Sequence, residues 1–431
     1  MFKLYILLLS LFLTICDTQN EQKVCSDQGS KCETININKY NEHTYIFYDV
    51  NKPEGFNLRR DVYIRMATFV KILNKMKIKR YVLVLPPWSE LFHWKSKHLN
   101  QNSIPWNEFF DVDSLNKYVP VVEMKDYFAY HNIWNKDSLV IDEVFILKHF
   151  EEMFETGNFQ DKYEYTNDCK EKTELNDLWG YSNVTFGTVK CLKFQGTTSL
   201  LKNIIKDSKA NSIMFAHAEI PLHDTWGSPE FWRARRSMRF SQPLVKLAND
   251  FRKTYLNSTD DNDNTLRPLS WKDEKYSRNA IGGNYISVHL RRQDFLWGRS
   301  KHIPNIKYAA QQIEKNCNKL QIFTVFLATD AFSIEISDLR SFLEPKIKVY
   351  TFKPTSDIEK KIKDGGKAIV EQIICSHAKY FIGTYESTFS FRIQEEREIL
   401  GFPKTTTFNR LCGDKETDKK CSQTTVWSIM F

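Results

Sequence analysis

The chain has 431 residues, of which 42% are hydrophobic and 14% aromatic, so it is long enough for two domains with buried cores and is not disordered throughout. Its 61 Lys and Arg residues are interleaved with 53 Asp and Glu residues, and the formal net charge is +8. Nucleic acid is therefore not the expected partner, whereas an anionic ligand held by local arginines is compatible with this balance.

The amino-terminal segment is typical of a secretory signal peptide, which we expect over residues 1–20. A single Lys precedes an apolar run that ends near Cys16, and this run is shorter than a typical membrane-spanning helix. A signal anchor is the alternative, and the brevity of the run disfavours it. We therefore expect the mature chain to be soluble, either inside the secretory pathway or outside the cell.

The cysteines suit an oxidising compartment. Of the nine, eight lie beyond Cys16, and three pairs that are close in sequence are predicted as disulfides, although spacing leaves their connectivity open: Cys25 with Cys32, Cys169 with Cys191, and Cys412 with Cys421. Cys317 and Cys375 lie in helix-like segments and are expected to be free, buried thiols. Asn183 and Asn257 begin N-x-Ser/Thr glycosylation motifs, which fit surface loops of a secreted protein.

A predicted strand, turn and helix occupy residues 45–73. The apolar residues 45–48 indicate a buried strand, Pro53 and Gly55 a turn, and a helical face follows with Val62, Met66, Phe69, Val70 and Leu73. In open α/β folds, ligands bind where such a strand ends and the next helix begins. Glu54 lies in this turn, where a carboxylate beside an anionic ligand has the makings of a general base. A surface Glu in an ordinary loop is the alternative.

Strand and helix patterns alternate from residue 44 to about residue 150, with a second buried strand at residues 81–85, as in βαβ units. Residues 162–177 are charged and aperiodic, which indicates a surface insertion. The polar run at residues 257–265 is the strongest linker signal in the chain. We therefore expect an N-terminal Rossmann-like domain over residues 21–250 and a C-terminal one over residues 251–431.

The alternation resumes after this run. We expect strands at residues 285–289, 322–328, 346–350 and 380–383, and helices at residues 305–320 and 368–377. The predicted fold class is α/β, with two doubly wound domains that face a central cleft.

Two segments of the second half are suited to bind phosphate. Arg291 and Arg292 follow the strand at residues 285–289, and guanidinium groups can hold a diphosphate without a metal. Ser387 and Thr388 stand at a strand–turn–helix junction, where hydroxyl groups and the helix N-terminus favour phosphate. Surface salt bridges and an ordinary capping turn would give the same patterns.

Several longer motifs together resemble one enzyme family. The motifs are P-E-G-F-N-L-R-R, Y-V-L-V-L-P-P-W, H-L-R-R-Q-D-F, K-D-G-G-K-A-I and F-I-G-T-Y-E-S-T-F-S-F, which begin at residues 53, 81, 289, 363 and 381. They are similar to those of the GDP-fucose protein O-fucosyltransferases of the second type, which modify thrombospondin type 1 repeats. The resemblance extends from about residue 44 to the C-terminal cysteine pair.

This resemblance implies a GT-B arrangement of two Rossmann-like domains, inversion at the anomeric carbon of fucose, and no metal or other cofactor. It implies that Glu54 takes the proton from the acceptor hydroxyl and that Arg291 stabilises the departing diphosphate. It also implies a set of residues around GDP-fucose, namely Pro53, Gly55, Phe56, Asn57, His289, Leu290, Arg291, Glu371, Ser387, Thr388 and Phe389. Glu371 stands where the family usually has an Asp that reads the guanine.

Three alternatives accompany this interpretation. A sister transferase would act on EGF-like repeats, and a non-catalytic relative would bind folded repeats as a chaperone or lectin; retention of both Glu54 and Arg291 disfavours the latter. The D-x-D sequences at residues 111–113 and 261–263 are typical of metal-dependent transferases. We interpret the first as the start of a helix and the second as linker, and expect no metal.

Overall fold

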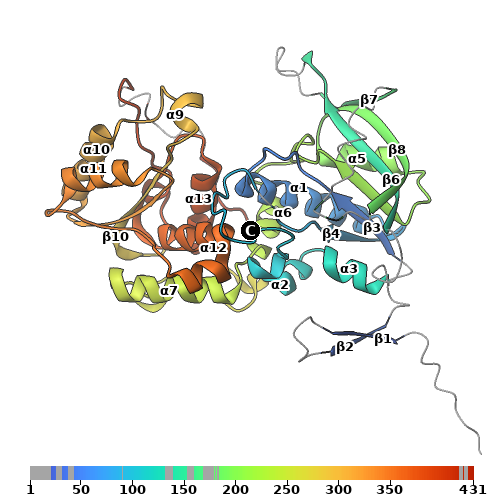
Figure 1. Ribbon diagram of the computed structural model, residues 1–431, viewed down its shortest axis with the longest axis horizontal. Coiled ribbons are helices and arrows are strands. Elements are labelled where there is room, and N and C mark those ends of the chain that lie inside the picture. Colours follow the sequence, from blue (N-terminus) through green and yellow to red (C-terminus); the bar gives the residue numbers. More distant parts are fainter. Residues whose placement is uncertain are drawn as a thin grey trace, which may run out of the picture.

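The computed structural model describes residues 21–25, 32–36, 43–89, 91–131, 139–152, 160–167, 179, 181, 184–416, 421 and 426–431 (Figure 1). Two sheets, of seven and four strands, lie in two α/β halves of the molecule, and a separate antiparallel pair is formed by β1 (Glu21–Cys25) and β2 (Cys32–Asn36). Among the described residues, no helix has both the length and the apolar character that a membrane crossing requires.

The seven-stranded sheet has the order β5-β4-β3-β9-β6-β8-β7. Its strands are β3 (His43–Tyr48), β4 (Arg80–Leu85), β5 (Val121–Glu123), β6 (Leu139–His149), β7 (Lys162–Thr166), β8 (Val184–Gln195) and β9 (Ser212–Ala216). All neighbours are parallel except β7 and β8. Alternate residues of β3 pack on opposite faces, Ile46 in one core cluster and Phe47 in another, so the strand is buried on both sides.

Helices cover this sheet. They are α1 (Phe56–Lys75), α2 (Val112–Asn116), α3 (Met124–Tyr130), α5 (Leu201–Ile205) and α6 (Pro229–Ser237), with 3₁₀ turns at Trp106–Glu108 and Thr198–Leu200. The five apolar residues predicted for one face of α1 are all buried, which confirms the strand, turn and helix expected over residues 45–73.

The four-stranded sheet is parallel throughout, in the order β12-β11-β10-β13. Its strands are β10 (Gly283–Leu290), β11 (Thr324–Thr329), β12 (Lys348–Tyr350) and β13 (Ala378–Ile382). Its helices are α7 (Gln242–Leu256), α8 (Asp260–Asp263), α9 (Phe295–Gly298), α10 (Ile306–Leu320), α11 (Ser333–Leu343), α12 (Ser356–Ser376) and α13 (Thr388–Leu400), with 3₁₀ turns at Trp271–Asp273 and Lys404–Thr406. Each strand and helix predicted for this half is present, and the two-sheet α/β fold class is confirmed.

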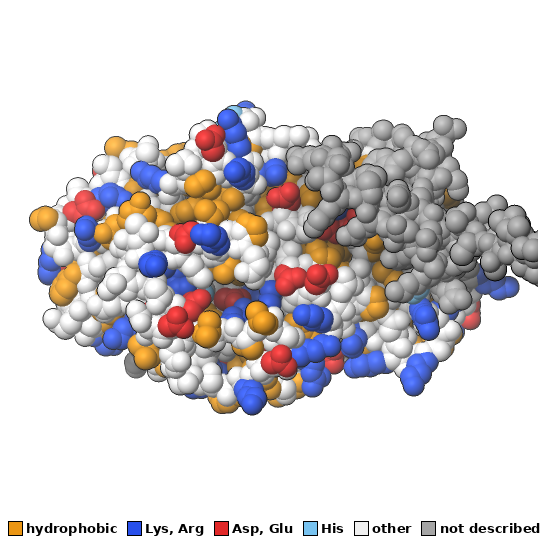
Figure 2. Space-filling view, turned by 90° about the horizontal axis from the view of Figure 1, so that it is seen from below, with side chains coloured by type: hydrophobic (Ala, Val, Ile, Leu, Met, Phe, Trp, Pro, Cys, Tyr) orange, Lys and Arg blue, Asp and Glu red, His pale blue; other side chains and the backbone are white. Residues whose placement is uncertain are grey.

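The two halves share one continuous core. A single cluster of buried side chains contains Phe56 and Val62 of α1 together with Leu244 of α7 and Ile369 of α12. Two further clusters fill the outer faces of the two sheets. Helices α12 and α13 lie between the sheets, and α7 lies beside α12 (Figure 1). The face seen in Figure 2 carries Lys and Arg interspersed with Asp and Glu, as the balanced composition predicts.

Two local predictions were wrong. Lys162–Thr166 of the expected surface insertion is an edge strand, β7, in which Tyr163 is partly buried and Glu164 is exposed. The polar run at residues 257–265 is not an open linker, because it contains α8 and a buried network. Arg252, which is fully buried, donates to Ser258 Oγ at 3.1 Å and to Asp263 Oδ2 at 2.9 Å. The domain boundary near residue 250 stays a prediction.

The predicted Cys412–Cys421 disulfide is present, and Cys317 and Cys375 are free and buried, as expected. Cys191 is disulfide-bonded, whereas Cys169, its predicted partner, lies outside the described residues. The signal peptide, Asn183 and the side chains of Cys25 and Cys32 also lie outside them. Asn257 is exposed at the end of α7, where a glycan would be accessible.

Candidate active site

The turn that carries Glu54 connects β3 with α1, and Arg59 holds it in place. Arg59 Nε donates to the carbonyl oxygen of Glu54, and Nη2 donates to the carbonyl oxygens of Val50 and Asn51, each at 3.0 Å. Gly55 is the N-cap of α1. The Glu54 carboxylate is partly buried, and only burial and neighbouring charges act on its pKa, so it is free to take a proton.

A second carboxylate, that of Glu219, affects the pKa of Glu54. Burial raises the pKa of Glu54, and the negative charge of Glu219 raises it further, whereas Arg59 and Arg65 act in the opposite direction. Glu219 accepts a hydrogen bond from Asn51 N at 3.2 Å, and hydrogen bonds lower its own pKa although burial opposes them. Glu219 therefore stays ionised and makes Glu54 a stronger base.

The end of β10 supplies the opposite side of the site. His289 is buried, its ring stacks on Phe389 with centroids 4.4 Å apart, and its Nδ1 lies 2.8 Å from Ser390 Oγ. Ser390 Oγ also accepts from Thr384 N at 2.9 Å, so this hydroxyl connects the His289 ring to the turn before α13. Burial, assisted by the charge of Arg291, lowers the pKa of His289 to about 3, and the imidazole is neutral.

Arg291 comes directly after β10, and several hydrogen bonds and ion pairs hold it. Its backbone N donates to Thr384 Oγ1 at 3.0 Å, and its guanidinium pairs with Asp294 and Asp330. Its Nη2 lies 3.4 Å from Nδ1 of His93, which belongs to the other half. A guanidinium fixed in this way is oriented before a diphosphate arrives, which is what charge stabilisation in a transition state requires.

Arg292 has a different place. It is buried, and it pairs with Glu335 at 2.6 Å and donates to the carbonyl oxygen of Pro304 at 2.7 Å. Of the two arginines predicted at the end of this strand, Arg292 therefore holds α11 and the loop before α10, and only Arg291 lies toward the other half.

Four of the predicted residues lie on α12 or at the start of α13. Ser387 occupies the N-cap position of α13 but makes no side-chain capping hydrogen bond, so the cap expected there is absent and Thr388 and Phe389 begin the helix uncapped by it. Glu371 is partly buried on α12, and burial raises its pKa to about 7, with Asp330 contributing and Lys367 opposing. A carboxyl group that is easily protonated can donate as well as accept a hydrogen bond.

The last predicted residues to be placed, Pro53, Phe56, Asn57 and Leu290, differ in exposure. Pro53 is exposed, whereas Phe56 is buried among aromatic rings and Leu290 in the core of the second sheet. Asn57 Oδ1 accepts from Gln372 Nε2 at 2.8 Å, so the Glu54 turn is tied to α12. The structure thus gathers the predicted residues at the junction of the two halves, from the ends of β3 and β10 and from α12 and α13.

Four residues with a place in this site were missed from the sequence: His93, Glu219, Asp294 and Asp330. Asp294 had a signal, because it follows Arg291 by three residues inside the H-L-R-R-Q-D-F motif. Asp330 directly follows the strand at Thr324–Thr329, and the carboxyl ends of neighbouring parallel strands meet at one edge. His93 and Glu219 lie in loops without periodicity, and no local pattern indicates them.

In each of the two D-x-D sequences, one aspartate has a structural role. Asp111 caps α2 by accepting from Ser114 N at 3.0 Å, which confirms the predicted helix start, and Asp263 pairs with buried Arg252. Within the described ranges, no group of three or more His, Cys, Asp or Glu residues is arranged to hold a metal ion.

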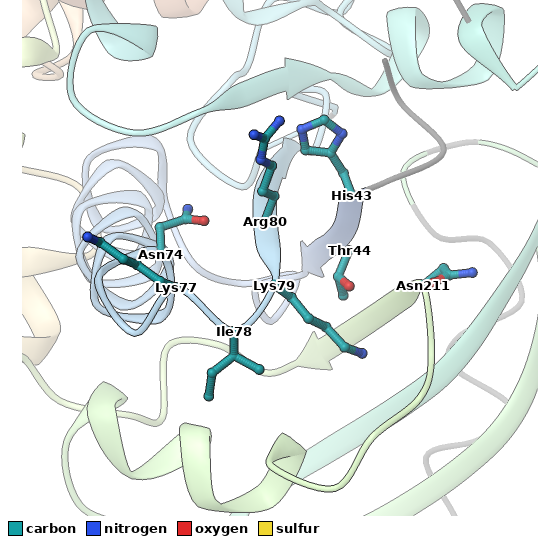
Figure 3. A pocket seen from close by; sticks show the side chains of 8 residues that line it. All are labelled: His43, Thr44, Asn74, Lys77, Ile78, Lys79, Arg80 and Asn211. Carbon is teal, nitrogen blue, oxygen red and sulfur yellow. The ribbon is translucent and has the colours of Figure 1, made fainter. Parts of the chain in front are cut away.

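Two surface cavities lie away from the site. One, of about 610 Å³, is at the amino ends of β3 and β4, where the side chains of Lys77, Lys79 and Arg80 point in different directions (Figure 3). The other, of about 600 Å³, lies along α10 beside the Cys412–Cys421 disulfide. Neither contains a predicted site residue.

Comparison with known proteins agrees with this geometry. Residues 45–400 match the O-FucT family, described as GDP-fucose protein O-fucosyltransferase. The chain is 42% identical over 407 residues to GDP-fucose protein O-fucosyltransferase 2 of Drosophila melanogaster, covering 90% of this chain and 82% of that protein. It is 42% identical over 398 residues to the Homo sapiens protein of the same name, covering 90% of each, and 40% identical over 414 residues to that of Caenorhabditis elegans, covering 92% and 93%.

Solved structures agree on the fold. A crystal structure of POFUT1 in complex with GDP-fucose superposes with a TM-score of 0.55 at 18% identity, covering 86% of this chain and 98% of that one. An apo form of POFUT1 gives a TM-score of 0.54 at 17% identity, with 86% and 98% covered. The family match spans most of the chain, and three curated relatives exceed a third of identical residues over nearly their full length. The chain therefore belongs to the GDP-fucose protein O-fucosyltransferase family, and it is a glycosyltransferase that uses GDP-fucose as its donor.

Proposed function

We propose that this enzyme transfers fucose from GDP-fucose to Ser or Thr hydroxyls of folded thrombospondin type 1 repeats, with inversion and without a metal, in the lumen of the endoplasmic reticulum. The observation that carries the proposal is the placement of Glu54 and Arg291 on opposite halves, joined through His93. The motifs shared with the second type of the family support the choice of acceptor, and the disulfides support the compartment.

In the proposed reaction the acceptor oxygen attacks the anomeric carbon of fucose while the bond from that carbon to the diphosphate breaks. The hydroxyl proton passes to Glu54, whose raised pKa makes it a suitable base, and the electron pair of the broken bond leaves with GDP. Arg291 stabilises the charge on the leaving diphosphate. A single displacement from the face opposite the leaving group inverts the anomeric centre.

The absence of a metal in this proposal rests on what the charged residues do. Arg291 is a fixed cation directly after β10, and its two carboxylate partners orient it. Asp111 and Asp263, from the two D-x-D sequences, already have helix-capping and ion-pairing roles. The protein therefore has its own positive charge for the diphosphate, and one carboxylate of each D-x-D sequence is already in use.

A folded acceptor is preferred for an entropic reason. A linear peptide would lose chain entropy on binding and would present its hydroxyl in many orientations, whereas a disulfide-bonded repeat presents it in one. Specificity would then follow the shape of the repeat, with water filling an imperfect fit.

The test is transfer of labelled fucose by the purified protein to three acceptors. These are folded thrombospondin type 1 repeats, the same repeats after reduction and alkylation, and folded EGF-like repeats. We expect labelling of the first alone. Comparable labelling of the reduced repeat would contradict recognition of the fold, preference for the EGF-like repeat would identify the sister activity, and binding without transfer would indicate a non-catalytic chaperone or lectin.

A further inference from the structure

His93 occupies a bridging position in the loop after β4. Its Nδ1 lies 3.4 Å from Nη2 of Arg291 in the other half. On its other side the ring packs against Gly55, so closely that a Cβ added to Gly55 would come within 2.9 Å of His93 Cδ2. One imidazole thus contacts both the turn that holds Glu54 and the arginine proposed for the diphosphate.

The loop that carries His93 is anchored to α12. Ser96 donates from its backbone N and its Oγ to Asp364 at 3.0 and 2.7 Å, and Gln101 Nε2 donates to the same carboxylate at 3.0 Å. Beside Asp364, Gly365 has no side chain, so the Trp94 ring can approach the helix; an added Cβ would meet it at 2.8 Å. These contacts hold the backbone around His93 in place, so the ring position is well defined.

The chemistry of the contact fixes the tautomer of His93. A guanidinium can only donate hydrogen bonds, so Nδ1 of His93 must accept and the ring proton must lie on Nε2. Partial burial and the positive charge of Arg291 both lower the pKa of His93, with Asp294 opposing, which is consistent with a neutral ring. Among the described residues, none is bonded to Nε2. The His93 side chain therefore interacts with the rest of the protein through Nδ1, which faces Arg291, and through the packing of its ring on Gly55.

We propose that His93 is a positioning residue for fucose transfer, which orients Arg291 toward the diphosphate of the donor and fixes the distance between that arginine and the Glu54 turn. Asp294 pairs with the same Nη2 nitrogen and Asp330 pairs with Nη1, and both aspartates come from the same half as Arg291. His93 is the partner from the opposite half, so it sets how the Arg291 guanidinium is turned toward that half. This inference rests on the proposed roles of Glu54 and Arg291.

Three substitutions separate the contact from simple space filling. The Oδ1 atom of Asn can take the place of His Nδ1, whereas the longer amide of Gln reaches the place of Nε2. We expect His93→Ala and His93→Gln to lower kcat/KM by about 10²-fold, the loss typical of a reacting group misplaced by about 1 Å. We expect His93→Asn to retain most of the activity. Lys97→Ala is the matched control, because Lys97 is exposed in the same loop, four residues after His93, and it should leave activity unchanged.

Binding of GDP, measured by calorimetry, gives a readout that does not depend on the acceptor. We expect weaker GDP binding in the Ala and Gln variants and near-normal binding in the Asn variant, with the same thermal unfolding midpoint in all four proteins. Equal GDP affinity and activity in the Ala and Asn variants would overturn the proposal, as would equal losses in Asn and Gln. Failure of the wild-type protein to label any repeat would refute the proposed acceptor and leave the calorimetric result as the test of His93.

Discussion

Gln372 of α12 donates a 2.8 Å hydrogen bond to Asn57 of α1, although the two residues are 315 positions apart. Gln372 also accepts from Arg60 Nη1 at 2.7 Å, and Arg60 is fully buried over the rings of Phe56, Phe110 and Phe240. A neutral amide thus ties the Glu54 turn to the opposite half and partners a buried guanidinium.

Replacement of Gln372 by Ala should therefore destabilise the enzyme. The change leaves Arg60 without its short hydrogen bond in a buried place, and hydrogen bonds to buried charged groups contribute about 2 kcal/mol each. We expect a loss of this size in the free energy of unfolding measured with urea. Gln311→Ala, at an exposed position of α10, is the control and should change stability little; equal values for the two variants would contradict the role of the amide.

Replacement of Glu54 by Gln should abolish proton transfer and spare donor binding. The amide keeps the shape of the side chain but is not basic, and loss of a general base typically lowers the rate by about 10² to 10⁴-fold. We expect this loss in kcat with little change in the dissociation constant of GDP. Arg291→Ala is the counterpart and should weaken GDP binding as well as turnover. Near-normal turnover of Glu54→Gln would remove Glu54 from the mechanism.

The pH dependence should respond to Glu219. A base acts only when it is deprotonated, so the rate falls as the pH falls through the pKa of Glu54, which burial and then Glu219 raise. Glu219→Gln removes the negative charge and can still accept from Asn51, so the acid limb of the kcat/KM profile should move to lower pH. Glu314→Gln removes a carboxylate of α10 that pairs with Lys346 away from the site, and it should not move the limb. A shift to higher pH in Glu219→Gln would show that the limb belongs to another group.

Stability should depend on pH through Asp61. This buried carboxylate pairs with Arg65, His223 and Arg392, and these partners lower its pKa although burial alone would raise it. Breaking a buried ion pair costs about 3 to 5 kcal/mol, which we expect for Asp61→Asn at pH 7. Because the folded pKa lies below the unfolded value of about 3.9, the stabilisation is complete above that pH and is lost as the pH falls further.

The measurement for Asp61 is urea unfolding of the wild type and Asp61→Asn from pH 7 to pH 3. The difference in stability should be constant down to about pH 4 and shrink below it. Asp250→Asn breaks only an exposed pair with Lys246 and should cost less than about 1 kcal/mol at any pH. A difference between wild type and Asp61→Asn that grows on acidification would contradict this assignment.

Chelation should leave the activity intact. If Arg291 and the N-terminus of α13 stabilise the diphosphate, no cation is lost when EDTA is added in large excess. The check is the initial rate of fucose transfer before and after dialysis against EDTA. Loss of activity that manganese restores would show that a metal takes part in the reaction.

Local sequence patterns predicted the parts of the fold and site that depend on neighbouring residues. The strand, turn and helix around Glu54 are visible because an apolar run, Pro53, Gly55 and a 3.6-residue periodicity follow one another within 30 positions or so. The same holds for the strand that precedes Arg291. In both places the backbone geometry is decided by residues that are adjacent in the chain.

Some of the misses depend on contacts between distant residues, and others on local signals that were overlooked. The acidic run after Asn257 resembles a linker, but its Asp263 neutralises the buried Arg252, which composition does not reveal. The alternation of Tyr and charged residues in β7 is a real strand signal, obscured by the charged residues around it. His93 could not be found, because its partners Gly55 and Arg291 come from other segments of the chain.

The shared core has a consequence for how the chain folds as it is made. Arg235 of α6 is buried and pairs with Glu395 and Glu396 of α13, which are synthesised 160 and 161 residues later. Until then its charge lacks these acidic partners, and the part of the shared core that α12 contributes is missing. Such surfaces are prone to aggregate during translation. The first half should therefore depend on chaperones until the last helix emerges, and neither half should be stable when expressed alone.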